Sequence, residues 1–192
     1  MGGNNNAPAI GGSYKVTVTG YGYDPSKNDF CAHKQGACGF LLPPEIPQIA
    51  LAVGFAKPGQ PGECGTCWRV QNCRTGGNDC VASANGGDGA IYVMHNTCGS
   101  DPNKPDGPCN VANGSKDKDG SSTVVDMCMD SGAGPKWWGP KKEKGWAGKN
   151  FADMVQVDCK ELGASIISQC DWGGATYKGG PMKLAPGPVK KC

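Results

Sequence analysis

Twelve cysteines, an even number, constrain the fold of this 192-residue chain more than any other feature. They are spread along the whole chain, at Cys31, Cys38, Cys64, Cys67, Cys73, Cys80, Cys98, Cys109, Cys128, Cys159, Cys170 and Cys192. Such a distribution is typical of proteins from oxidising compartments, where cysteines pair as disulfides. We therefore expect up to six disulfides and a secreted, extracellular protein. The sequence leaves their connectivity open.

Metal binding is the alternative use of these cysteines. Cys64 and Cys67 form a Cys-x-x-Cys pair, but the sequence holds no second such pair, and its two histidines, His33 and His95, do not have the spacing of a ligand pair. Structural zinc sites need a complete ligand set at fixed spacing. A thioredoxin-like redox site would need a strand-to-helix context that the residues after Cys67 do not supply. We expect no metal and no other cofactor.

Composition narrows the fold class and the partners. The chain holds 32 glycines and 15 prolines, about a quarter of its residues, and only 38% hydrophobic residues, which argues against a helical bundle. A formal net charge of +2 gives little attraction to polyanions, so neither nucleic acid nor an acidic membrane surface is an expected partner. No stretch has the length and apolar character to span a bilayer.

The length predicts a single domain. We place it over 14–192, including a C-terminal extension, after a flexible Gly- and Asn-rich segment over 1–13. The first residues lack the charged and apolar regions of a signal peptide, and we expect a mature secreted product. The sequence does not reveal the oligomeric state, and a monomer is the expectation.

Hydrophobic patterning predicts a small β-barrel. Over 14–19, Tyr14, Val16 and Val18 alternate with polar residues, as in a half-buried strand. Further short strands are predicted over 68–72, 90–95, 123–127 and 154–159. Apolar residues at helical spacing over 44–53 predict one short helix, and 161–169 is a weaker second helix because Gly163 and two isoleucines disfavour it.

Aromatic residues suggest a binding surface for an extended neutral polymer, because rings stack on the apolar faces of sugars. Trp137, Trp138 and Trp146 lie in a Gly- and Lys-rich segment predicted to be a loop. Capping of the barrel by one of these rings is the alternative. Trp68 fits either the core or a sugar subsite. The remaining substrate-binding candidates are Tyr21 and Tyr23, which lie at the end of the first predicted strand, just before Asp24.

Hydrolysis of a glycosidic bond requires a proton donor and a group that activates water from the opposite side. Asp126 is the strongest donor candidate because it ends a strand between apolar residues and precedes Cys128, and apolar surroundings raise the pKa of a carboxyl. Asp24 is a candidate partner, although Asp-Pro-Ser is equally typical of a turn. A serine-hydrolase elbow and a nucleotide-binding glycine loop are both absent from the sequence.

Four blocks resemble, in order, those of glycoside hydrolase family 45 endoglucanases and expansins. They are Cys-Gly-Thr-Cys-Trp-Arg-Val over 64–70, Ile-Tyr-Val-Met-His-Asn-Thr-Cys over 91–98, Val-Val-Asp-Met-Cys over 124–128 and Met-Val-Gln-Val-Asp-Cys over 154–159. The resemblance implies a six-stranded double-psi β-barrel, mainly β, with long disulfide-stapled loops and an open sugar-binding groove.

The chain looks most similar to the compact fungal branch of family 45. By that resemblance Asp126 would be the general acid of an inverting β-1,4-glucanase, and the base would be Asn103 or, in the commoner family arrangement, Asp24. The family usually has Asp where this chain has Asn96, which removes a charge from the implied groove. Asn96 is therefore a further candidate catalytic residue.

Three functions are consistent with these residues. The first is a secreted endo-β-1,4-glucanase acting on cellulose or a related β-glucan polysaccharide. The second is a non-hydrolytic, expansin-like protein that binds carbohydrate and loosens walls, with Asp126 as a hydrogen-bond acceptor. The third is a secreted inhibitor or effector on the same barrel, which would bind proteins through the long loops.

Overall fold

The computed structural model describes residues 12–24, 29–33, 36–38, 42–56, 64–75, 80–99, 103, 108–111, 115–139 and 149–162. Residues 1–11 of the expected flexible segment, and the chain after Leu162, lie outside this range. The domain limits and the helix over 161–169 therefore stay predictions. Within the described residues, no helix has the length and apolar character required to cross a bilayer.

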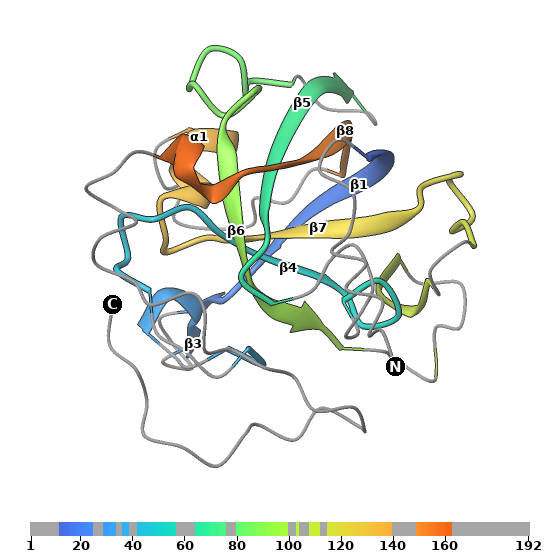
Figure 1. Cartoon of the computed structure of the whole chain (residues 1–192), viewed down its shortest axis with the longest axis horizontal. Coiled ribbons are helices and arrows are strands. Elements are labelled where there is room, and N and C mark those ends of the chain that lie inside the picture. The colour runs from blue at the N-terminus through green and yellow to red at the C-terminus, as the bar shows by residue number, and fades with distance from the viewer. Residues whose placement is uncertain are drawn as a thin grey trace, which may run out of the picture.

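Six strands close into a barrel in the order β1, β7, β4, β6, β5, β8. Their bounds are β1 Ser13–Tyr21, β4 Gln48–Ala52, β5 Cys67–Thr75, β6 Ile91–Cys98, β7 Thr123–Cys128 and β8 Asn150–Val157. The pairs β1/β7 and β4/β6 are parallel, and the other four pairs are antiparallel. Figure 1 shows these strands crossing around one interior. The expected double-psi β-barrel class is confirmed.

The remaining elements are short. A two-stranded ladder joins β2, Tyr23–Asp24, to β3, Asp29–Phe30. Single 3₁₀ turns form at η2, Cys31–His33, η3, Pro108–Asn110, and η4, Cys159–Leu162. One α-helix, α1, spans Ala133–Trp138 and follows β7 directly. Among the described residues, loops and turns therefore make up most of what lies outside the barrel strands, as the Gly and Pro content predicts.

Alternate side chains of β1 point into the barrel. Val16 and Val18 are fully buried in the core, and Tyr14 packs at the edge of that core as the alternation predicts. The Tyr14 ring lies edge-on to Phe55 at 5.0 Å and to Trp68 at 5.9 Å between centroids. These rings fill the interior beside the valines, in the edge-to-face arrangement that aromatic pairs prefer.

The helix predicted over 44–53 is wrong, because Gln48–Ala52 forms strand β4. This strand pairs on one side with β6 and on the other with β7, and all five of its residues are buried. A strand covered on both faces reads as a continuous apolar run without alternation, which a short helix pattern imitates. The α-helix of the described residues lies instead in a segment predicted to be a loop.

Ten of the twelve cysteines form five disulfides, and Cys170 and Cys192 lie outside the described residues. The pairs are Cys31–Cys128, Cys38–Cys64, Cys67–Cys159, Cys73–Cys80 and Cys98–Cys109. Cys64 and Cys67 thus belong to two different disulfides. Their Cys-x-x-Cys spacing therefore reflects two separate structural cross-links and no redox pair.

Candidate active site

Asp126 lies on the outer side of the barrel. Its neighbours in β7, Val125 and Met127, are fully buried in the core. Because successive side chains of a strand point to opposite faces, the pleat turns the Asp126 carboxyl away from the interior. The residue is partly exposed. It is therefore held by a rigid strand yet reachable from outside the core.

Asp126 belongs to a row of residues that runs across four neighbouring strands. Thr19 of β1 pairs with Asp126, Asp126 pairs with Ala50 of β4, and Ala50 pairs with Asn96 of β6. In-register neighbours share one face of a sheet. We call these four residues the outer row. It places two polar side chains, those of Asp126 and Asn96, on either side of one alanine.

The surroundings of the Asp126 carboxyl favour its protonated form. Thr19 Oγ1 donates a hydrogen bond to Oδ1 at 2.9 Å, and the Cys98 sulfur lies 3.8 Å from Oδ2. Burial raises the pKa of Asp126 to about 6, against the smaller lowering effect of the Thr19 hydrogen bond. A carboxyl with such a pKa can hold a proton at mildly acidic pH and donate it to a leaving group.

The disulfide between Cys98 and Cys109 closes one side of this environment. Cys98 is the last residue of β6, and its partner lies in η3. The η3 turn contacts both β7, which carries Asp126, and β4, the next strand of the outer row. A cross-link therefore ties the η3 turn to the end of β6, where the Cys98 sulfur lies beside the carboxyl.

Asn96 is held by backbone groups. Its Oδ1 accepts hydrogen bonds from the amides of Ala37 at 2.8 Å and Thr97 at 2.9 Å. The β4/β6 register shifts between Ile49 and Ala50, so that His95 has no partner in β4. Bulges of this kind redirect side chains and are frequent beside active sites.

The two candidate bases are less completely described. Asp24 lies in β2 and pairs with Asp29, but the side chains of Tyr23 and Asp24 lie outside the described part of the structure. Asn103 is exposed. The identity of the residue that activates water stays a prediction.

The aromatic candidates divide between core and surface. Trp68 and Trp137 have no exposed surface and pack in the core, so the expectation that they contact sugar is corrected. Trp137 is buried because α1 packs it against Tyr92, 6.4 Å between ring centroids. Trp138 is partly exposed, and Trp146 lies outside the described residues. Tyr21 is partly exposed and packs beside the Cys31–Cys128 disulfide.

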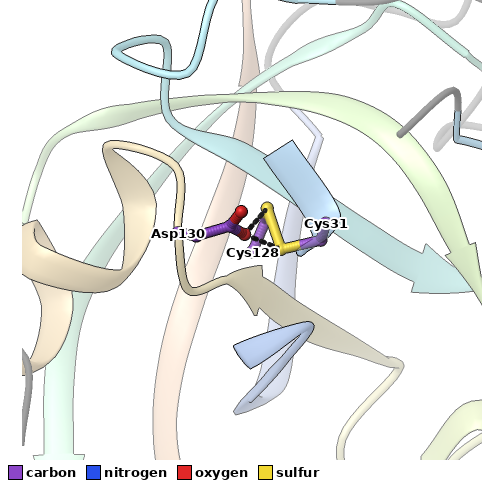
Figure 2. A group of neighbouring side chains, drawn as sticks. All are labelled: Cys31, Cys128 and Asp130. Carbon is purple, nitrogen blue, oxygen red and sulfur yellow. Dashed lines mark hydrogen bonds between the residues drawn. A yellow bond between two sulfur atoms is a disulfide. The ribbon is translucent and has the colours of Figure 1, made fainter. Parts of the chain in front are cut away.

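Cys31, Cys128 and Asp130 form a cluster with the appearance of a metal site (Figure 2). The two sulfurs are bonded to each other, so they are no thiolate ligands. Asp130 Oδ1 accepts a hydrogen bond from the amide of Ala32 at 3.0 Å and lies 2.8 Å from the Cys31 sulfur. The cluster joins η2 to the end of β7, two residues beyond Asp126, and thus has a structural role.

One solved structure resembles this arrangement over most of its length. The β-1,4-D-endoglucanase Cel45A from the blue mussel Mytilus edulis aligns with a TM-score of 0.50 over 83% of this chain and 92% of that chain, at 18% sequence identity. The two proteins share a fold. The resemblance to family 45 endoglucanases is thereby confirmed at the level of the barrel. No family model and no curated protein sequence matches the chain.

Sequence reasoning missed two residues of this environment. The alternation over 14–19 puts Thr19 on the polar face of the first strand, but nothing in the local pattern indicates that it pairs with Asp126, 107 positions later. Ala37, whose amide binds Asn96, carries no side-chain signal at all. Both contacts depend on the pairing of distant segments, which the local sequence does not encode.

Proposed function

We propose that the protein is a secreted, monomeric endo-β-1,4-glucanase that hydrolyses cellulose or a related β-glucan with inversion of configuration. The observation that carries this proposal is the Asp126 carboxyl, partly exposed on the outer row with its pKa raised to about 6. The fold shared with a β-1,4-D-endoglucanase supports the substrate class. The disulfides support an extracellular location.

In the proposed reaction, protonated Asp126 donates its proton to the glycosidic oxygen as the bond to the anomeric carbon breaks. Water attacks that carbon from the opposite face of the sugar, and the Asp24 carboxylate or the side-chain carbonyl oxygen of Asn103 accepts the proton that the water loses. In an inverting pair of carboxyls the two groups stand about 6.5 to 9.5 Å apart, which leaves room for the water. Tyr21 and Trp138, both partly exposed, are the described aromatic candidates for sugar contact.

The test is the release of reducing ends from amorphous cellulose and from soluble mixed-linkage β-glucan. The Asp126→Asn variant should lose at least about a hundredfold in rate, the usual contribution of a general acid. Asp153→Asn is the matched control, because Asp153 lies on β8 with its carboxyl bound to Arg74. Equal activity of the Asp126→Asn variant and the unchanged protein would contradict the proposal.

One observation favours the non-hydrolytic, carbohydrate-binding alternative. Asn96, a neutral amide, occupies the β6 position of the outer row for which the resemblance to family 45 implies an aspartate. A protein that binds glucan and releases no product would fit this alternative. Binding of insoluble cellulose, measured beside product release on the same sample, distinguishes the two functions.

A further inference from the structure

We propose that Asn96 is a neutral hydrogen-bond donor of the site, whose Nδ2 group binds a hydroxyl or ring oxygen of a glucan chain beside Asp126. This inference rests on the function proposed above. It assigns a positioning role to Asn96. The presence of an amide in place of a carboxylate would by itself suggest only a loss of charge.

Two backbone amides fix the orientation of the Asn96 side chain. Ala37 and Thr97 both donate to Oδ1, at 2.8 and 2.9 Å. Only the carbonyl oxygen can accept these bonds, since the opposite assignment would set an N–H group against two N–H donors. Nδ2 therefore points away from both amides. It makes no hydrogen bond within the described residues, and the side chain is partly exposed.

The same face of the sheet carries Asn96 and Asp126. Ala50 pairs with both residues, so their Cα atoms lie two strand spacings apart, about 9.5 Å. Cys98 follows Asn96 by two positions in β6 and touches Asp126 Oδ2 with its sulfur. Side chains two residues apart in a strand share a face. The Asn96 amide is therefore directed to the side of the barrel that carries the acid.

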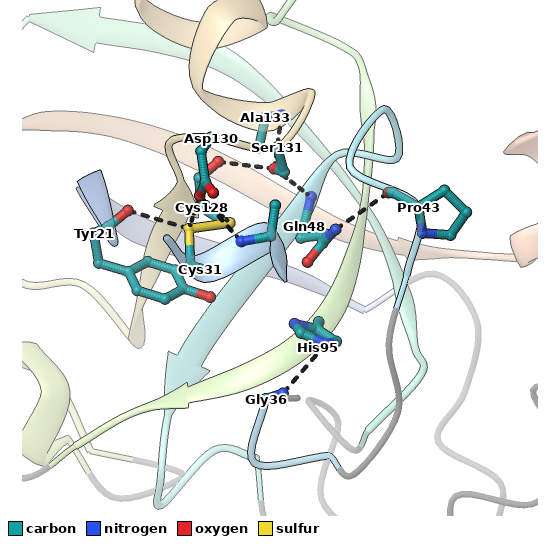
Figure 3. The surroundings of a disulfide bond; sticks show 11 residues. Tyr21, Cys31, Gly36, Pro43, Gln48, His95, Cys128, Asp130, Ser131 and Ala133 are labelled. Carbon is teal, nitrogen blue, oxygen red and sulfur yellow. Dashed lines mark hydrogen bonds between the residues drawn. A yellow bond between two sulfur atoms is a disulfide. The ribbon is translucent and has the colours of Figure 1, made fainter. Parts of the chain in front are cut away.

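A cross-linked segment holds Asn96 in this position. The amide of Gly36 donates to His95 Nε2 at 3.4 Å, and the amide of Cys38 donates to the His95 carbonyl at 3.3 Å. Figure 3 shows the contact between Gly36 and the His95 ring. Together with Ala37, three consecutive residues thus bind the bulge of β6. A Cβ at Gly36 would lie 2.3 Å from the His95 carbonyl oxygen, so a larger residue cannot occupy this position without a shift.

The Cys38–Cys64 disulfide fixes this segment from the other side. Gly65, next to Cys64, donates its amide to the Met94 carbonyl at 3.0 Å. Both ends of the disulfide are therefore tied to β6 immediately before Asn96. Such support is what a side chain needs to hold one orientation before a ligand binds.

The Asn96→Asp substitution isolates the donor. A carboxylate oxygen would accept the same two amide hydrogen bonds, so the local structure should persist. The change replaces Nδ2 by a negatively charged acceptor on the face that carries Asp126. It therefore removes the proposed donor and adds a charge whose effect on Asp126 can be measured without any sugar.

The experiment has two readouts on the full chain. Carboxyl ¹³C NMR titration should find the Asp126 pKa raised by about one pH unit in Asn96→Asp, because a like charge disfavours ionisation. Asn85→Asp, in the loop before β6, is the control and should leave that pKa unchanged. Calorimetry with cellohexaose, on an Asp126→Asn background that does not cleave it, should show at least tenfold weaker binding when Asn96→Asp is added.

The outcomes separate the two proposals. An unchanged Asp126 pKa, or cellohexaose binding that is equal with and without Asn96→Asp, overturns the inference while the glucanase proposal stands. Failure of the Asp126→Asn protein, and of the unchanged protein, to bind cellohexaose at all overturns the proposed function itself.

Discussion

Thr19 and Asp126 pair directly across the parallel strands β1 and β7, and the Thr19 hydroxyl donates to the Asp126 carboxyl at 2.9 Å. The closure of the barrel creates this contact between residues 107 positions apart. It orients a carboxyl that burial keeps protonated to unusually high pH.

The rate of hydrolysis should fall as pH rises through about 6. The pKa of Asp126 is raised to about 6, and only the protonated carboxyl can act as general acid. Above that value kcat/KM should decrease about tenfold per pH unit. The pH profile on soluble β-glucan measures this. A rate that stays constant from pH 5 to pH 8 would exclude Asp126 as the acid.

Removal of the Thr19 hydroxyl should move this profile. The Thr19 hydrogen bond lowers the pKa of Asp126, so Thr19→Val should raise the pKa further and extend activity by roughly half a pH unit to higher pH. Thr19→Ser keeps a hydroxyl and should restore the original profile. A reduced rate with an unmoved pH profile would indicate a purely structural role for Thr19.

The free energy of unfolding should also depend on the ionisation of the Asp126 carboxyl. The folded-state pKa of Asp126 is raised from 3.8 to about 6. The contribution of this carboxyl to the free energy of unfolding is therefore most favourable below pH 3.8 and is lost as pH rises through 6. The free energy of unfolding of Asp126→Asn, relative to that of the unchanged protein, should therefore be about 1 to 2 kcal/mol higher at pH 7 than at pH 4. This value is reduced for the partial exposure of the side chain. Urea denaturation at both pH values measures it.

The stability contribution of Asp153 should change with pH in the opposite direction. The hydrogen bond from Arg74 lowers the pKa of Asp153, so its contribution is present at neutral pH and is lost on acidification through the lowered pKa. Asp153→Asn should be less stable than the unchanged protein at pH 7. If both variants respond to pH in the same direction, the pKa assignments are wrong.

Two disulfides of similar loop length should differ in their effect on activity. Cys98–Cys109 joins residues 11 positions apart and Cys73–Cys80 joins residues 7 positions apart, and loss of each disulfide should cost about 2 to 3 kcal/mol of stability. Replacing Cys98 and Cys109 by alanine should also reduce activity, because the sulfur contacts Asp126 and η3 borders it. The Cys73 and Cys80 double variant should keep its activity when assayed well below its Tm. Equal losses of activity would contradict a specific role for η3.

The sequence predicts most of the barrel and misses what depends on pairing. Alternation identifies β1, and short β-branched or aromatic runs identify β5, β6, β7 and β8. The strand β4 escapes because it is buried on both faces and its apolar residues show no alternation. Asp126 is recognisable from its place in a strand between apolar residues. The row that joins it to Thr19 and Asn96 exists only after the barrel closes.

The central claim is that Asp126 protonates a glycosidic oxygen in an inverting hydrolysis. Proton NMR of cellohexaose during its cleavage follows the anomeric configuration of the first product directly. The α-anomer should appear first with the unchanged protein, and Asp126→Asn should release product at least about a hundredfold more slowly. Initial release of the β-anomer, or cleavage at an undiminished rate by Asp126→Asn, would contradict it.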